Sequence, residues 1–132
     1  MKMESLKIKV VLPISAAKLY KAWLSSKEHT AFTGGAAKAT DKVKGKHSAW
    51  DGYISGKNLE LVPGKKIIQS WRTTEFPDNA PDSTLEISLE EKAGKTTLTL
   101  YHHGLQKGDA KKYKSGWENH YFEPMKEYFR KD

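Results

Sequence analysis

Residues 111–131, KKYKSGWENHYFEPMKEYFRK, form the stretch that decides the fold. Large side chains recur in it at steps of four, four, four and three, namely Tyr113, Trp117, Tyr121, Met125 and Tyr128. This spacing places them on one face of a helix about 30 Å long, at 1.5 Å per residue. Such a face needs an equally broad apolar partner, and the short alternating segments upstream can supply one. The sequence therefore predicts a long C-terminal helix lying across a curved antiparallel sheet.

Two residues within this helix oppose a regular geometry. Gly116 weakens the first turn because glycine loses more backbone freedom than other residues on entering a helix. Pro124 has no backbone N–H, and its ring crowds the preceding turn. We expect a kink at Pro124 or a break just before it.

The N-terminal third predicts one strand and two short helices. Apolar residues alternate with lysines over residues 6–12, which is typical of a strand with one buried face, and Pro13 ends it. Ser15 is suited to cap a helix that runs through residue 24. Residues 25–28 have capping-box spacing and predict a second short helix that stops at the glycines 34–35.

The central part predicts a meander of about five strands. They are expected at 46–55 with a bulge at 51–52, at 59–62 after a turn at 56–58, at 66–76, at 85–89 and at 96–103. Short turns between strands indicate an antiparallel sheet. The prediction is an α+β fold in which about six strands curve around one helix and the short helices close the opening.

Composition restricts the class of protein. At 132 residues with 37% hydrophobic and 30% charged residues, the chain predicts one globular domain over 1–132. Cysteine is absent, which excludes disulfides, thiol catalysis and cysteine metal sites. No segment reaches 18 apolar residues and no signal peptide is recognisable, so we expect a cytoplasmic protein without a membrane span.

The net charge of +7 raises the question of an acidic partner. Arg72 and Arg130 are the only arginines among the 23 basic residues, and the lysines are scattered along the chain. Nucleic-acid recognition depends strongly on the arginine fork. The pattern favours a lysine-coated surface, and we expect no nucleic-acid partner.

Several motifs carry a resemblance to a known family. They are LYKAW at 19–23, FTGG at 32–35, WDGYISGKNLEL at 50–61, QSWR at 69–72, Gly116-Trp117 and FEP at 122–124. With these motifs the whole chain resembles the START-like superfamily, also called SRPBCC or Bet v-like. Within it, the chain is similar to the group related to the C-terminal domain of the activator of heat-shock-protein-90 ATPase.

The resemblance implies a helix-grip fold and two kinds of function. Relatives hold apolar small molecules or lipids in a cavity between the long helix and the sheet. One branch binds a heat-shock chaperone. His47 and Ala49 stand where relatives tend to have large apolar side chains, so inward-facing residues there would enlarge the cavity and add a polar group.

Nine residues are candidates for lining this cavity: His47, Ala49, Gln69, Trp71, Leu98, Leu100, His102, Trp117 and Tyr121. The polar ones would orient a ligand. Each also has a structural explanation, since His47 can be solvated at the end of the sheet, while His102 and Trp117 can be core residues. His102 and His103 are adjacent on a strand and face opposite ways, so they are poorly placed to share a metal.

Three functions follow from these features. The favoured one is a binding protein for an apolar or amphipathic small molecule, and the second is a protein-interaction module of the chaperone-activator type. The third is an enzyme in which a cavity histidine or aspartate moves protons for a carbonyl or aromatic substrate. No catalytic or dinucleotide motif is recognisable, so we expect no cofactor and no metal, and Asp51 is read as a residue that fixes its turn.

Overall fold

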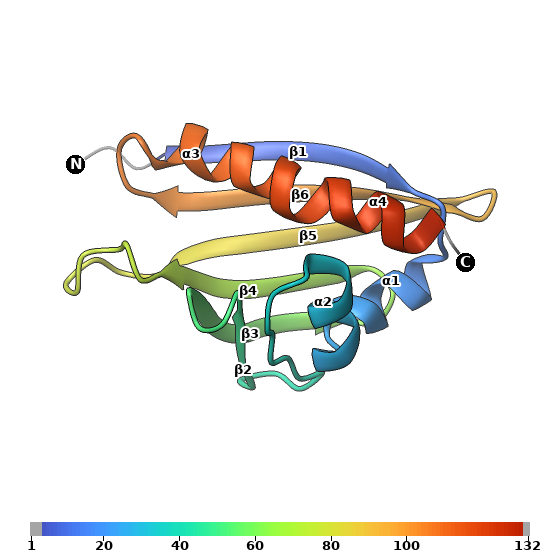
Figure 1. The fold of residues 1–132 in the computed structure, drawn as a ribbon, viewed down its shortest axis with the longest axis horizontal. Helices are drawn as coiled ribbons and strands as arrows, with labels where there is room; N and C mark the ends of the chain where they lie inside the picture. The colour runs from blue at the N-terminus through green and yellow to red at the C-terminus, as the bar shows by residue number, and fades with distance from the viewer. Residues whose placement is uncertain (1–3, 131–132) are drawn as a thin grey trace.

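The computed structural model describes residues 4–130 as a curved six-stranded antiparallel sheet and a long C-terminal helical run (Figure 1). The strand order is β1-β6-β5-β4-β3-β2, so β1 and β2 are the two edges. The strands are β1 Glu4–Leu12, β2 Lys46–Ala49, β3 Ile54–Val62, β4 Lys66–Thr73, β5 Ser83–Lys92 and β6 Lys95–Leu105. The helices are α1 Ala16–Trp23, α2 Ser26–Thr33, α3 Asp109–Gly116, the π-helix η1 Trp117–Phe122 and α4 Glu123–Arg130. The predicted α+β helix-grip architecture is confirmed.

The N-terminal elements form as their sequence patterns predict. Every second residue of β1 from Leu6 to Leu12 is buried, and the lysines between them are exposed. The Ser15 hydroxyl accepts a hydrogen bond from the Lys18 amide at 3.3 Å and caps α1. Ser25 caps α2 in the same way. These caps satisfy amide donors that have no partner inside the helix.

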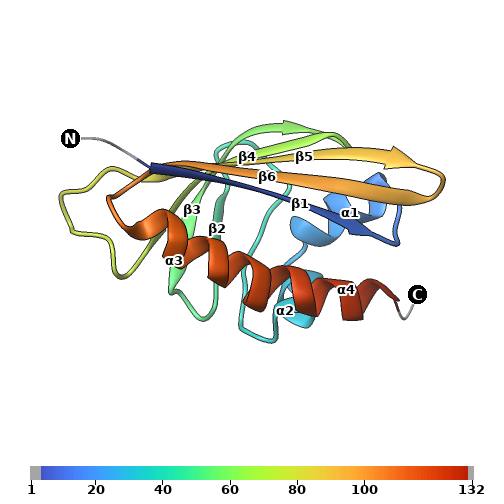
Figure 2. The same ribbon diagram turned by 90° about the horizontal axis from the view of Figure 1, so that it is seen from above.

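The C-terminal helical run crosses the concave side of the sheet as one continuous element (Figure 2). The predicted break before Pro124 is wrong, because the chain stays helical there and changes helix type instead. The π-helix η1 ends at Phe122, two residues before Pro124, which is the second residue of α4. Proline cannot donate the hydrogen bond of a regular α-turn, and a π-turn rearranges the bonding of that region. Lys131, the predicted last residue, lies outside the described residues.

The residues that this helical run buries against the sheet are the predicted ones, except at its C-terminal end. Trp117, Tyr121 and Met125 are each at most 3% exposed. Phe129 is buried as the next member of the series, whereas Tyr128 is only half-buried. The buried stripe therefore continues at steps of four rather than ending in a step of three.

The segment from 46 to 62 differs most from the prediction. The turn lies at 50–53 and separates β2 from β3, whereas the predicted turn at 56–58 lies within β3. Trp50 and Asp51 have positive φ values of 53° and 57°, a conformation that sequence reasoning does not expect for tryptophan. The bulge lies between Asn58 and Glu60 instead of at 51–52.

Position 56 requires glycine because of packing in the sheet and not because of a turn. A Cβ atom at this position would lie 1.8 Å from the carbonyl oxygen of Ser70. The glycine therefore allows close approach of backbone in the sheet, which is the other common use of glycine in a strand. Its sequence signal is the same as that of a turn.

Within residues 4–130, no helix has the length and hydropathy that crossing a membrane requires. The predicted cytoplasmic location stays a prediction.

Candidate functional site

An aromatic cleft of about 430 Å³ opens between the helical run and the sheet. One wall is formed by α3 and η1, and the other by the 50–53 turn, β3 and β4. Its aromatic lining consists of Trp50, Tyr53, Trp71, Tyr113, Trp117 and Tyr121. Small-molecule sites are typically clefts of roughly 300–1,000 Å³ with mostly apolar walls. The size and lining of this cleft fall within that range.

The cleft lies at one end of the helical run because the other end is filled. Met125 and Phe129 of α4 are at most 2% exposed. The Phe32 ring of α2 lies 6.0 Å from that of Phe129, so α2 closes this end of the core. At the α3 end the cleft lining includes two small residues, Ser115 and Gly116, which are the last two of α3.

Three of the nine predicted site residues, Trp71, Trp117 and Tyr121, line the cleft. The other six lie outside its lining: His47, Ala49, Gln69, Leu98, Leu100 and His102. Leu98 and Leu100 are fully buried in the core on β6. Whether any of the nine contacts a ligand stays a prediction.

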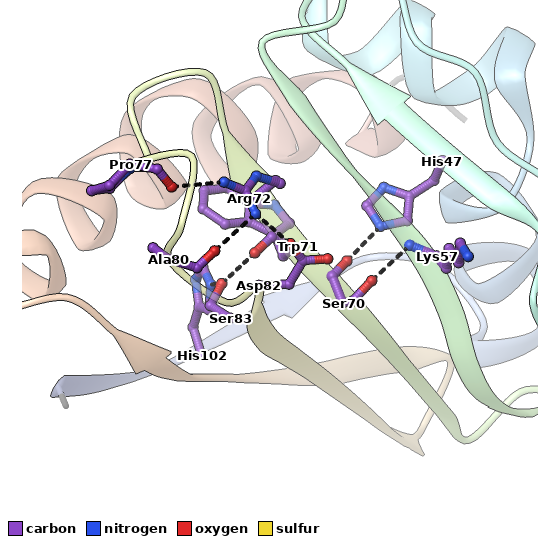
Figure 3. A network of polar contacts seen from close by, with 10 residues as sticks. All are labelled: His47, Lys57, Ser70, Trp71, Arg72, Pro77, Ala80, Asp82, Ser83 and His102. Carbon is purple, nitrogen blue, oxygen red and sulfur yellow. Dashed lines mark hydrogen bonds and ion pairs between the residues drawn. The ribbon is translucent and has the colours of Figure 1, made fainter.

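His102 is held in a buried chain of hydrogen bonds that supports one wall of the cleft. Figure 3 draws the part of it formed by His102, Ser83 and Trp71. The Trp117 indole N–H donates to His102 Nδ1 at 3.1 Å. Nδ1 is therefore unprotonated, and Nε2 carries the proton that it donates to Ser83 Oγ at 2.8 Å. Ser83 Oγ in turn donates to the Trp71 carbonyl at 2.6 Å. This series of hydrogen bonds fixes Trp117 against β4.

Burial decides the charge of His102. It lowers the pKa of the imidazole to about 3, with a smaller contribution from nearby His103. The ring is therefore neutral at physiological pH. Because both ring nitrogens already have partners, His102 has no lone pair left to act as a base or a ligand contact in this conformation.

Gln69 belongs to a second buried series of hydrogen bonds, which holds the loop at 40–42 to the core. Its Oε1 accepts from the Trp23 indole N–H at 3.3 Å, and its Nε2 donates to Asn58 Oδ1 at 2.8 Å. Asn58 Nδ2 then donates to the carbonyls of Thr40 and Lys42. These bonds hold loop 40–42 against β3, and neither Gln69 nor Asn58 belongs to the cleft lining.

His47 and Ala49 are both buried on β2, outside the cleft lining. His47 Nε2 donates to the Ser70 carbonyl at 2.9 Å, as Figure 3 shows. Burial lowers the pKa of His47, and the hydrogen bond to Ser70 partly opposes this. A Cβ at Gly56 would lie 2.6 Å from His47 Nε2, so the ring covers this glycine. The predicted solvated alternative for His47 is wrong.

His29 was not among the sequence candidates, yet it positions Tyr121. Its Nδ1 donates to the Trp23 carbonyl at 2.9 Å, which leaves Nε2 to accept from the Tyr121 hydroxyl at 3.0 Å. Burial lowers the pKa of His29 to about 4. The Tyr121 ring therefore lines the cleft while its hydroxyl is held by α2. In the sequence, His29 stands three residues before Phe32, so the two side chains share one face of the helix. This spacing could have indicated that His29 faces the core.

Polar side chains tie the two walls together near Lys112. The Tyr53 hydroxyl donates to Glu75, and the Lys112 ammonium of α3 pairs with the same carboxylate. These two contacts lower the pKa of Glu75, with that from Lys112 the larger. Tyr113 and Thr73 share a further hydrogen bond of 2.8 Å. Opening the cleft at this end would require breaking these contacts.

Among the described residues that line the cleft, Lys112 is the only one with a fixed charge, and His120 is the only imidazole. No group of three or more metal-ligating side chains comes together within residues 4–130. The arrangement is suited to holding an apolar ring between aromatic side chains, with a cation at one side.

Known proteins resemble this chain in both sequence and structure. A human protein, activator of 90 kDa heat shock protein ATPase homolog 1, is 30% identical over 115 residues. That alignment covers 87% of this chain and 34% of the human protein, so the chain spans about a third of the curated relative.

Solved structures share the fold. An HSP90 activator from Plasmodium falciparum superposes with a TM-score of 0.83 at 23% identity, covering 90% of this chain and 91% of that one. Ara h 8.0201 superposes with a TM-score of 0.76 at 12% identity, covering 99% and 100%. Residues 13–130 match the family described as activator of Hsp90 ATPase homolog 1-like protein. The chain belongs to this family.

Proposed function

We propose that this protein binds an apolar or amphipathic small molecule in the aromatic cleft. The observation that carries the proposal is the cleft itself, a space of about 430 Å³ with six aromatic side chains around it. Removing apolar surface from water contributes about 25 cal/mol per Å², before the costs of association. A flat apolar ligand would gain this contribution from Trp71, Trp117 and Tyr121, three of the residues predicted from sequence.

The buried hydrogen-bond chains support the proposal by keeping the walls in place. Trp117 is fixed through His102, and Tyr121 through His29. A site whose side chains are already held loses less conformational entropy when a ligand arrives. His102 and Gln69 therefore act on the shape of the site and its surroundings rather than on the ligand.

The test is to fill the cleft without disturbing the fold. Gly116 lines the cleft, has helical dihedrals of −62° and −45°, and a Cβ there would meet no other heavy atom within 4 Å. Gly116→Leu should therefore fold and occupy part of the space. Anilinonaphthalene sulfonate, whose fluorescence rises in apolar surroundings, is titrated into the wild type and the variant.

We expect the wild type to bind the dye and Gly116→Leu to bind it at least tenfold more weakly. Lys111→Leu, an exposed position of α3 outside the cleft lining, is the matched control and should bind as the wild type does. Equal binding by wild type and Gly116→Leu would place the dye elsewhere and reject the proposal.

A second function is favoured by the family match. We propose that the chain also contacts a 90 kDa heat-shock chaperone, as the name of its human relative suggests. The net charge of +7 predicts that such binding weakens as salt rises. A pull-down with the purified chaperone at low and high salt tests this. Gly116→Leu should leave the pull-down unchanged, because this function uses a surface and not the cleft.

A further inference from the structure

The Lys112 ammonium lies at the edge of the aromatic cleft, and contacts with both walls place it there. Its Nζ lies 5.1 Å from the centre of the Tyr113 ring on α3. The same Nζ pairs with Glu75, whose carboxylate also accepts a hydrogen bond from the Tyr53 hydroxyl of the opposite wall. Tyr53 and Tyr113 both line the cleft. The cation is therefore held beside the cleft opening and does not extend away from it into solvent.

The Lys112 ammonium is accessible and keeps donors that the protein does not use. The side chain of Lys112 is 44% exposed and that of Glu75 is 49% exposed. An ammonium has three N–H donors, and Glu75 is the one acceptor that Lys112 Nζ contacts among the described residues. Because an ion pair this exposed contributes little free energy, a second carboxylate can share the ammonium or replace Glu75. The Glu75 contact also shows that a carboxylate fits against this cation.

The rest of the cleft lining favours a negatively charged ligand over a positively charged one. No described residue of the lining is a carboxylate, since Glu75 lies outside it. A second cation would be repelled by Lys112, which already lies near the Tyr113 ring. The buried rings of Trp71 and Trp117 would hold a flat apolar body by stacking or edge contacts. A ligand placed in this way keeps its charged group at the accessible edge of the cleft.

We propose that the cleft binds a small aromatic carboxylate, with the ring between the aromatic walls and the carboxylate on the Lys112 ammonium. The proposal rests on the proposed small-molecule function and specifies its ligand class. Glu75 then competes with the ligand for the same cation. Substitutions of Lys112 and Glu75 should therefore change the affinity for the carboxylate in opposite directions.

Two probes of the same shape isolate the charge of the ligand. 2-Naphthoate and 2-naphthamide share a fused ring system, and only the naphthoate is negatively charged at neutral pH. Each is titrated into the protein in the same buffer, and its dissociation constant is measured by isothermal titration calorimetry. The wild type should bind naphthoate about fivefold more tightly than naphthamide, the upper end of what an exposed ion pair contributes. Gly116→Leu, which fills part of the cleft, should weaken the binding of both probes.

Four substitutions test the roles of the two charged residues. Lys112→Met removes the ammonium and keeps an aliphatic side chain, so the ratio of naphthoate to naphthamide affinity should fall to about one. Glu75→Gln removes the competing charge and keeps an acceptor for the Tyr53 hydroxyl, so the ratio should rise by about twofold. Lys114→Met and Glu118→Gln are the matched controls. They make the same changes of charge at exposed positions outside the cleft lining and should keep the wild-type ratio.

The outcomes separate the two proposals. If neither probe binds the wild type, or Gly116→Leu binds both as the wild type does, the cleft does not hold small aromatic molecules and the proposed function itself fails. If both probes bind in the cleft with equal affinity, or the ratio persists in Lys112→Met, only the carboxylate proposal is overturned. An equal fall of the ratio in Lys114→Met would assign the preference to overall charge and overturn it as well. The ratio in Glu75→Gln decides the matter even if Lys112→Met does not fold.

Discussion

Acidification should destabilise this protein through its buried neutral histidines, chiefly His102 and His29. The pKa of His102 is lowered from 6.5 to about 3, and that of His29 from 6.5 to about 4, in both cases chiefly by burial. Between these values and 6.5, the unfolded chain binds protons that the folded chain does not. Stability therefore rises with pH across this window and is lost as pH falls below 6.5.

The magnitude follows from the proton linkage. A histidine that titrates at 6.5 only when unfolded costs about 2 kcal/mol when pH drops from about 7.5 to about 5. His29 and His102 together should cost about 4 kcal/mol, a large part of a typical domain stability of about 5–15 kcal/mol. Urea denaturation at the two pH values, followed by tryptophan fluorescence, measures the loss.

Single substitutions show which histidine causes the loss of unfolding free energy at low pH. His102→Gln should reduce the pH-dependent loss by about 2 kcal/mol, whatever its effect on stability at neutral pH. His29→Gln should likewise reduce the loss by about 2 kcal/mol, because burial lowers the pKa of His29 to about 4. An unfolding free energy that is unchanged between the two pH values in the wild type would refute the reasoning about buried neutral imidazoles.

Three further predictions concern packing, all measured as unfolding free energies in urea. Trp117→Ala should cost about 3–5 kcal/mol because the side chain is 3% exposed, and a cost below about 1 kcal/mol would contradict a buried helix face. Gly56→Ala should destabilise by about 1–3 kcal/mol, since its Cβ would lie 1.8 Å from the Ser70 carbonyl oxygen, and a neutral effect would show that the strands approach less closely. Gly116→Ala should instead stabilise by about 0.5–1 kcal/mol, because the position is helical and open, and a loss would indicate that the π-helix requires the glycine.

Patterns of alternation and helical spacing predicted most of the fold. The strand β1 and the stripe from Trp117 to Met125 bury the residues that their periods indicate. These predictions succeed because burial of one face is a local consequence of geometry. The Trp50 turn and Gly56 were misassigned because their roles depend on another strand, and no local signal distinguishes a glycine that permits close approach from one that makes a turn.

The candidate site was predicted only in part for a similar reason. Sequence period places Gln69, His102 and Trp117 on inward faces, and the structure agrees that all three are buried. The sequence period does not tell which inward-facing side chain contacts another side chain and which one borders open space. Gln69 and His102 found partners in β3, β5 and the helical run, whereas Trp117 also borders the cleft.

The proposed function requires that the aromatic cleft holds a small molecule. Native mass spectrometry of the protein purified from its own source, beside Gly116→Leu prepared identically, tests it most directly. We predict that the wild type carries a reproducible bound small molecule and that the variant, whose cleft is partly filled, does not. A wild type that is empty, or a variant that carries the same molecule to the same extent, would contradict the claim.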